Sequence, residues 1–391
     1  MSAVAHTFVH KIILVAGVLL FLVLICLPIA DHVFHIAPDV YMMETGPTQL
    51  PAISFATVFK SFNILQRGYL EKTFAFRKIL VRLENILDIF WLHSSDQSQT
   101  VIKGKGKWLF LSQENNELNV IQDFRSVKLY TPDQLAYWVK VFKGRQDWLA
   151  ARGIHYLIVV APNKHTVYPE FLPNQYNKVH PLSRMDQLVN ALEAADVDVL
   201  DLRSAMNQAK RQALLYYRTD THWNTFGAFV GYVQIMNRLS KWFPQFEPEI
   251  RGDFDITIAQ ELNGGLASML ALSDFFPESR VTFTPRSKRQ AVETADKLPT
   301  PPYFQPTVVM NTHDPKRPSA VIFRDSFAHE LIPFLSEHFD KSTYLWPYPS
   351  TSRGIRFFDN ARIEKEKPDV VIDEFVERYF TEFPPKEKAP Q

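Results

Sequence analysis

The chain has 391 residues, about two to three times the length of a typical domain, which leaves room for a large catalytic domain plus an accessory segment. Its 43 Lys and Arg residues nearly balance its 42 Asp and Glu residues, and the basic residues are scattered, which argues against a nucleic-acid partner. Because Cys26 is the single cysteine, an internal disulfide framework and a cysteine-rich zinc site are excluded.

The run from Ile12 to Ala30 contains no charged residue. As a helix rising about 1.5 Å per residue, it is long enough to cross a hydrocarbon core of about 30 Å. Lys11 precedes the run and Asp31 follows it, a bias that places the N-terminus in the cytoplasm. A cleaved signal peptide is the alternative, but the run exceeds a signal core of about 7–15 residues and no Ala-x-Ala site follows. Residues 1–30 are therefore predicted to be a cytoplasmic N-terminus and a transmembrane helix.

Residues 31–100 are predicted to be a membrane-proximal helical region. Prolines interrupt its first part, and apolar residues then recur at spacings of three and four as far as Phe90. A glycine-containing turn at residues 104–106 leads into a predicted strand at Trp108–Leu111.

From about residue 130 onward, helical patterns alternate with short apolar runs. Thr131 and Pro132 mark the start of one helix, and Leu182–Ala194 is a second. The apolar runs are predicted strands of a parallel sheet: Tyr156–Ala161, Val197–Leu202, Ala320–Phe323, Thr343–Trp346 and Val370–Ile372. The pattern predicts a three-layer α/β/α domain over residues 101–380, with a loop-rich insertion at 244–318 and a frayed tail at 381–391.

Two polar stretches lie at element boundaries of this predicted domain. Ser326 directly follows the strand Ala320–Phe323, and the carboxyl ends of parallel strands face the functional crevice, so Ser326 is placed as a nucleophile. Backbone N–H groups at the start of the following helix can stabilise an oxyanion. A serine hydroxyl needs a base and a group that orients the base, which His222 and Asp220 supply.

Each polar stretch alone also has a purely structural interpretation. Asp325 and Ser326 can cap the following helix, and Asn224 or Thr225 can cap the helix after His222. Short motifs of this kind match often by chance. The catalytic interpretation is favoured because all three residue types fall at strand and helix boundaries of one α/β chain that offers no rival constellation.

Taken together, the motifs resemble those of the alginate O-acetyltransferase family, the AlgJ- and AlgX-like proteins with an SGNH hydrolase-like domain. The resemblance covers roughly residues 65–380. The residues that carry it are Asp220-Thr-His222-Trp223-Asn224, Arg324-Asp325-Ser326-Phe327, Gly104-Lys-Gly-Lys-Trp108-Leu-Phe110, Val159-Val-Ala-Pro162-Asn-Lys164 with Tyr168-Pro169-Glu170, and Lys367-Pro-Asp-Val-Val-Ile372.

The resemblance implies an SGNH-hydrolase-like fold and transfer of acetyl groups to hydroxyls of an exported polysaccharide through an acetyl-serine. Ser326 is then the nucleophile, His222 the base and Asp220 the orienting carboxylate. The domain is expected on the periplasmic side of the inner membrane. Because acetyl-CoA is absent there, the implied acetyl donor is a multi-pass membrane O-acyltransferase, and no cofactor is expected.

Five further residues are candidates for substrate or oxyanion binding. Arg324 stands where GDS-type enzymes have a glycine, and its side chain crowds the turn that carries Ser326. Lys164 and Tyr168 are candidates for contacts to substrate hydroxyls or the oxyanion, with solvated surface positions as the alternative. Asn263, with two following glycines, offers backbone donors or forms a plain turn. Trp223 is the first candidate for a sugar platform, or it packs beneath the catalytic loop.

Two alternatives and two lesser points remain open at this stage. An acetyl esterase uses the same triad with water as acceptor, and a non-catalytic polysaccharide-binding assembly protein has a vestigial triad. His329 is a weak rival base, with an exposed helix position as its alternative. The histidines lack metal-ligand spacing, so no metal is expected.

Overall fold

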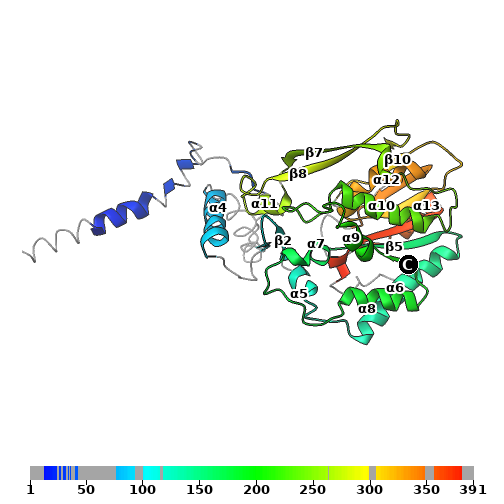
Figure 1. Ribbon diagram of the computed structural model, residues 1–391, viewed down its shortest axis with the longest axis horizontal. Coiled ribbons are helices and arrows are strands. Elements are labelled where there is room, and N and C mark those ends of the chain that lie inside the picture. Colours follow the sequence, from blue (N-terminus) through cyan, green and yellow to red (C-terminus); the bar gives the residue numbers. More distant parts are fainter. Residues whose placement is uncertain are drawn as a thin grey trace, which may run out of the picture. The chain divides into compact units, whose positions relative to one another are not determined.

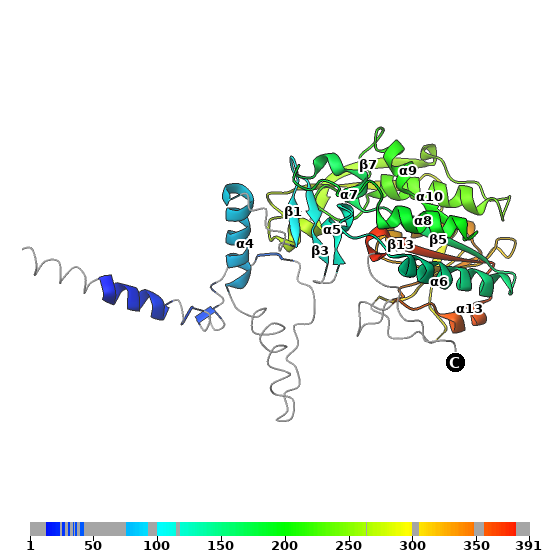
Figure 2. The same cartoon turned by 90° about the horizontal axis from the view of Figure 1, so that it is seen from below.

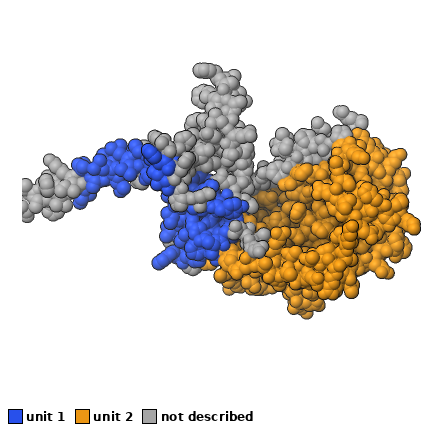
Figure 3. All heavy atoms as spheres, turned by 90° about the horizontal axis from the view of Figure 1, so that it is seen from above, with its two compact units in different colours: residues 1–95, 267–275 blue, residues 96–266, 276–391 orange. Residues whose placement is uncertain are grey.

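The computed structural model describes residues 13–23, 26–27, 30–31, 34, 36, 40–42, 76–92, 100–114, 118–262, 264–298, 305–347 and 356–380. The chain divides into two compact units, which Figure 3 colours separately. The smaller comprises residues 1–95 and 267–275, and the larger comprises residues 96–266 and 276–391.

A seven-stranded sheet forms the centre of the larger unit. Its strands, in spatial order, are β6 (Val199–Asp201), β5 (His155–Ala161), β13 (Val370–Val376), β11 (Ala320–Phe323), β12 (Lys341–Leu345), β10 (Val308–Asn311) and β9 (Val292–Thr294). The first five pair in parallel, whereas β10 is antiparallel to both of its neighbours. The predicted α/β fold with a mostly parallel central sheet is thus confirmed.

Helices cover both faces of this sheet (Figures 1 and 2). Alternate residues of β5 enter two separate cores: Leu157 and Val159 pack on the side of α9 (Arg203–Ala209) and α10 (Thr225–Leu239), and Ile158 and Val160 on the side of α6 (Pro132–Ala150) and α8 (Arg184–Ala194). A strand that is buried on both faces favours apolar residues at successive positions, which is why the sequence shows a continuous apolar run there. Reciprocal side-chain capping by Thr131 and Ser183 sets the starts of α6 and α8.

The segment at 244–318 contains regular structure where loops were predicted. β7 (Phe254–Leu262) and β8 (Glu278–Pro285) form an antiparallel pair, and β9 and β10 extend the central sheet. The prediction of a loop-rich segment did not identify these strands, because most of their residues are exposed or only partly buried. In β8, for example, buried and exposed residues are interspersed, so no continuous apolar run marks the strand.

In the smaller unit, α4 (Arg77–Leu87) continues into a π-helical turn, η2 (Asp88–Leu92), within the segment predicted to be helical. Arg82 donates two hydrogen bonds to the Asp274 carboxylate, at 2.8 and 2.7 Å. Residues 13–23 are helical, but the predicted transmembrane run also includes positions 12, 24–25 and 28–29, which lie outside the described residues. Within the described residues, no helix has both the length and the apolar character that a membrane span requires. The anchor stays a prediction.

Candidate active site

Two loops of the larger unit bring the predicted catalytic residues together. Asp220 and His222 lie in the loop between α9 and α10, residues 210–224, which we call the acid–base loop after their predicted roles. Ser326 lies just after β11, at the start of the 3-10 helix η5 (Phe327–Glu330), and we call residues 324–327 the nucleophile turn after its predicted role. The side chain of Asn224 caps α10 by accepting a hydrogen bond from the Gly227 N–H at 3.1 Å, which fixes the backbone just beyond His222.

The three side chains form a hydrogen-bonded series. Ser326 Oγ lies 2.8 Å from His222 Nε2, and His222 Nδ1 lies 2.6 Å from Asp220 Oδ1. The backbone N–H of His222 also donates to Asp220 Oδ1, at 3.0 Å. The ring is therefore oriented with Nδ1 towards the carboxylate and Nε2 towards the serine, the arrangement that a general base requires.

The Asp220 carboxylate receives a further hydrogen bond from outside its own loop. The Gly265 N–H donates to Asp220 Oδ2 at 2.5 Å. Burial alone would raise the pKa of Asp220, but His222 and the hydrogen bonds from His222 and Gly265 hold that pKa below its ordinary value. Gly264 must be glycine, because a Cβ there would lie 2.1 Å from Thr219 Oγ1.

This contact revises the prediction made for residues 263–265. Asn263 lies outside the described residues. The neighbouring glycine segment was expected either to offer donors near the serine or to form a plain turn, and its Gly265 N–H instead serves the triad carboxylate.

The buried side chain of Lys164 supports the acid–base loop. Its Nζ donates to the backbone carbonyls of Tyr217, Arg218 and Asp220 at 3.2, 3.1 and 2.5 Å. An ammonium has three donors, so all of them are used. This contradicts both interpretations of Lys164, as a ligand for substrate or oxyanion and as a solvated surface residue. Burial lowers its pKa to about 7, against the opposing effect of the Asp220 and Glu278 carboxylates.

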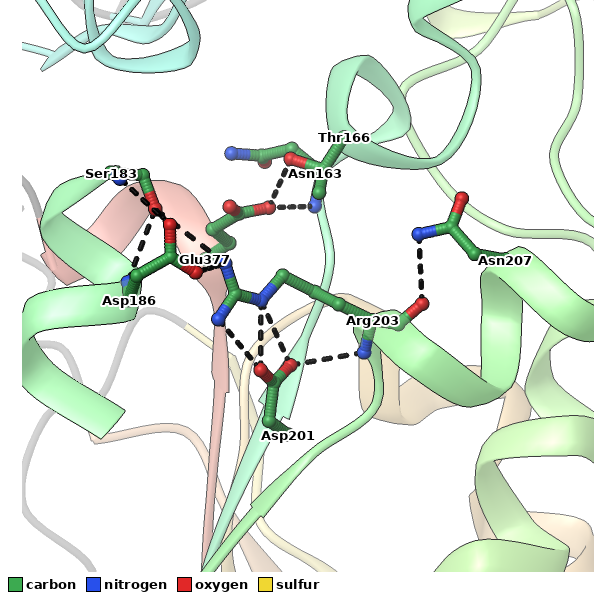
Figure 4. A network of polar contacts seen from close by, with 8 residues as sticks. All are labelled: Asn163, Thr166, Ser183, Asp186, Asp201, Arg203, Asn207 and Glu377. Carbon is green, nitrogen blue, oxygen red and sulfur yellow. Dashed lines mark hydrogen bonds and ion pairs between the residues drawn. The ribbon is translucent and has the colours of Figure 1, made fainter. Parts of the chain in front are cut away.

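A polar network anchors the short helix α7 (Lys164–Val167) that carries this lysine (Figure 4). The buried Glu377 carboxylate accepts hydrogen bonds from the Asn163 N–H at 2.8 Å and the Thr166 hydroxyl at 2.7 Å. Arg203 bonds to Asp201 and Asp186 in the same network. Burial raises the pKa of Glu377, and the Arg203 guanidinium opposes that rise. The network thereby fixes the backbone near the ends of β5, β6 and β13.

Buried carboxyl groups hold the nucleophile turn. Asp325 accepts hydrogen bonds from the N–H groups of Phe327 and Val376, at 2.8 and 2.6 Å. Glu374 accepts one from the N–H of Asp325, at 2.9 Å. Burial, and next the Asp325 carboxylate, raise the pKa of Glu374 well above its ordinary value. Asp325, rather than Ser326, therefore caps the helical turn, and the Ser326 hydroxyl is left to face His222.

Trp223 joins the two loops and is unavailable to a sugar. Its side chain is 0% exposed, and its indole N–H donates to the Phe327 carbonyl at 2.9 Å. The prediction of a sugar platform was therefore wrong, and the alternative of packing beneath the catalytic loop is what the structure shows. His222, which precedes Trp223, also contacts Ser326, which precedes Phe327. Two adjacent contacts therefore connect the loops.

The other predicted residues divide between buried and exposed positions. Tyr168 is buried, with its hydroxyl accepting the Leu215 N–H at 2.9 Å, so it supports the loop rather than lying at the surface. Arg324 is also buried, with its guanidinium 5.2 Å from the centre of the Trp346 ring. Its proposed role in substrate binding stays a prediction. His329 is exposed, and the imidazole within hydrogen-bond distance of the Ser326 hydroxyl is that of His222, with Nε2 2.8 Å from Oγ.

Residues 101–301 match the model of a protein family described as "SGNH hydrolase-like domain, acetyltransferase AlgX". The chain belongs to this family. The matched region includes Asp220 and His222 and ends before Ser326, so the role of Ser326 as nucleophile stays a prediction. No group of three or more potential metal ligands occurs in the part of the AlgX-family chain that the structure describes.

Two curated relatives are probable alginate O-acetylases named AlgJ. The protein from Pseudomonas putida is 28% identical over 185 residues, which is 45% of this chain and 43% of the relative. The protein from Pseudomonas aeruginosa is 30% identical over 162 residues, 41% of this chain and 38% of the relative. The matches thus span less than half the length of these relatives.

Among solved structures, PatB1 from Bacillus cereus shares the fold. It superposes with a TM-score of 0.53 at 17% identity, covering 72% of this chain and 97% of PatB1. At that identity the likeness shows the fold alone.

Proposed function

We propose that this protein transfers acetyl groups to hydroxyls of an exported polysaccharide through an acetyl-serine on Ser326. The observation that carries the proposal is the hydrogen-bonded series Ser326–His222–Asp220, with 2.8 and 2.6 Å between successive heavy atoms. The family's description as an acetyltransferase and the names of the AlgJ relatives support the choice of acetyl group and polysaccharide.

In the first half of the reaction, His222 Nε2 takes the proton of the Ser326 hydroxyl as Oγ attacks the acetyl carbonyl of the donor. The Ser326 backbone N–H is the donor proposed for the oxyanion, because it has no acceptor among the described residues, whereas the Phe327 N–H is engaged by Asp325. When the intermediate collapses, the bond to the donor oxygen breaks. His222 returns its proton to that oxygen, and the acetyl-serine remains.

In the second half, a sugar hydroxyl replaces the leaving group. His222 accepts its proton while the oxygen attacks the acetyl-serine, and the proton then passes to Ser326 Oγ as the acetylated sugar departs. The Asp220 carboxylate stabilises the imidazolium in both halves. The proposed donor is a multi-pass membrane O-acyltransferase, and the proposed location is the periplasmic face of the inner membrane, with residues 12–30 as a single-pass anchor.

The deciding experiment measures both acetyl-serine formation and its fate. Full-length protein is given a chromogenic acetyl ester with and without an oligosaccharide acceptor, and mass spectrometry follows acetate, acetylated sugar and the peptide that contains Ser326. We expect an acetylated peptide, diversion of acetyl from acetate to sugar as acceptor is added, and loss of all three signals in Ser326→Ala.

Two results would count against this function. Acetate release with no transfer at any acceptor concentration identifies an esterase. Unchanged polymer acetylation by cells carrying Ser326→Ala identifies a non-catalytic assembly protein.

A further inference from the structure

A pocket of about 630 Å³ lies beside the acid–base loop. Its lining includes Arg218, two residues before Asp220 in the same loop. The Arg218 carbonyl is fixed by the N–H of Leu109 and by Lys164 Nζ, so the backbone at this edge of the pocket is held in place. The volume is within the range of about 300–1,000 Å³ that is typical of ligand pockets.

The lining of this pocket is strongly basic, although the whole chain is almost neutral. Its charged residues are Lys105, Lys107, Lys210, Arg211 and Arg218 against one carboxylate, Glu170. We call it the basic pocket. Both oxygens of Glu170 are bound by Lys210 Nζ, at 3.0 and 3.1 Å, so the single carboxylate is already neutralised.

Three of these cations are available to a ligand. Lys107, Arg211 and Arg218 are exposed, and within the part of the chain that the structure describes their side chains have no hydrogen-bond or ion-pair partner. Positive charges gathered around one hollow raise the local concentration of an anion and favour its binding.

The Gly104–Lys107 turn is built to present its lysines at this pocket. It joins β1 (Val101–Lys103) to β2 (Leu109–Leu111), and Gly106 has a positive φ of 64°, which favours glycine. The N–H of Lys105 donates to the Phe171 carbonyl at 2.7 Å, and a Cβ on Gly104 would lie 2.5 Å from that same oxygen. The Gly104–Lys107 turn is therefore fixed to Phe171, which also lines the pocket.

An aromatic surface accompanies the cations. The Trp108 and Phe171 rings stack at 4.4 Å between centroids, and the half-buried Phe171 lines the pocket. Aromatic faces favour the apolar C–H faces of sugar rings, and cations favour carboxylates. A concave site with both features fits an acidic sugar better than a lipid surface, which requires cations on a protruding face.

We propose that the basic pocket binds anionic sugar residues of the polysaccharide acceptor. This assignment rests on the proposed function, which supplies the polysaccharide acceptor. It adds the charge of that acceptor and the place where it binds. Because Arg218 belongs to the same loop as Asp220 and His222, a chain bound at the pocket lies alongside the acid–base loop.

The test measures binding directly, without chemistry. Full-length protein is titrated by calorimetry with a hexamer of galacturonic acid, with cellohexaose as the neutral probe of equal length, at low and physiological salt. We expect the acidic hexamer to bind more tightly, with an affinity that falls as salt rises. The triple variant Lys107→Glu, Arg211→Glu, Arg218→Glu should weaken its binding about tenfold or more.

The matched control reverses the charge of three exposed lysines that do not line the pocket, with Lys140→Glu, Lys288→Glu and Lys316→Glu. It should bind the hexamer like the wild type. Thermal melts verify that both triple variants fold. Equal affinity for the two hexamers, or unchanged binding by the pocket variant, overturns the inference. The inference is also overturned if the protein binds phosphatidylglycerol vesicles through these three residues and does not bind the acidic hexamer. Ser326→Ala should bind the hexamer normally, so loss of the proposed chemistry and loss of the pocket are distinguishable.

Discussion

The two loops that meet at the Ser326–His222 hydrogen bond are held by opposite charges. In the acid–base loop, the carbonyls of Tyr217, Arg218 and Asp220 point to the buried ammonium of Lys164. In the nucleophile turn, backbone N–H groups point instead to the buried carboxyl groups of Asp325 and Glu374.

The difference shows how irregular backbone can be buried at a sheet edge. Neither loop is a regular helix or strand, so most of its polar groups need other partners, and leaving them unpaired would cost about 1–3 kcal/mol each. One buried lysine satisfies three acceptors, and two buried acids satisfy three donors. Thr219 is the exception in the acid–base loop, because its N–H and hydroxyl both donate to the Glu278 carboxylate, at 2.7 and 2.9 Å.

The largest effect is expected at Asp220, the carboxylate that orients His222 in the proposed reaction. Asp220→Asn should lower the turnover of an acetyl ester by about 10⁴-fold, because the amide no longer holds His222 in the productive tautomer. The double variant with Ser326→Ala should be no slower than Ser326→Ala alone, since the residues act as a unit. Asp255→Asn, at an exposed aspartate, is the control and should leave turnover unchanged. Turnover above a tenth of wild type in Asp220→Asn would contradict the series.

The next effect tests the acidic half of the comparison. Asp325→Asn should lower the free energy of unfolding by about 1–3 kcal/mol, because an amide NH₂ must face one of the two N–H groups that the carboxylate now accepts. Glu374→Gln is the matched change. Glu374 accepts a single N–H, from Asp325, and an amide oxygen can keep that hydrogen bond, so this change should cost much less. Chemical denaturation measures both, and equal losses would refute the distinction.

The third effect concerns the cationic half and appears gradually, as a pH dependence. Burial lowers the pKa of Lys164 to about 7, whereas an unfolded lysine titrates near about 10.4. Between these values the unfolded state binds more protons, so this group should make the free energy of unfolding rise with pH, by up to about 1.4 kcal/mol per unit. Below pH 7 the contribution is constant. The difference between wild type and Lys164→Met, measured by denaturation from pH 6 to 10, isolates this slope. A difference independent of pH would show that Lys164 does not titrate in this window.

Periodicity and local motifs were sufficient for most of the architecture. The fully buried strands were readable because burial on both faces favours continuous apolar runs, as in β5 and in residues Val370–Ile372 of β13. Most residues of β7 and β8 are exposed or partly buried, so these strands lack a continuous apolar run and were missed. The three residues of the predicted triad were identified because each adjoins a readable boundary, and their chemical roles stay predictions.

By itself, the sequence determined the α/β fold and which three residues form the hydrogen-bonded series. Only the tertiary structure decided what Lys164, Trp223 and Gly265 do, because their partners lie 56, 104 and 45 residues away along the chain. A lysine after a strand looks solvated and a tryptophan beside a base looks like a sugar platform until the packing is known. Burial is set by contacts between distant segments. Because both side chains are buried, they support the loops and are not available as ligands of a substrate.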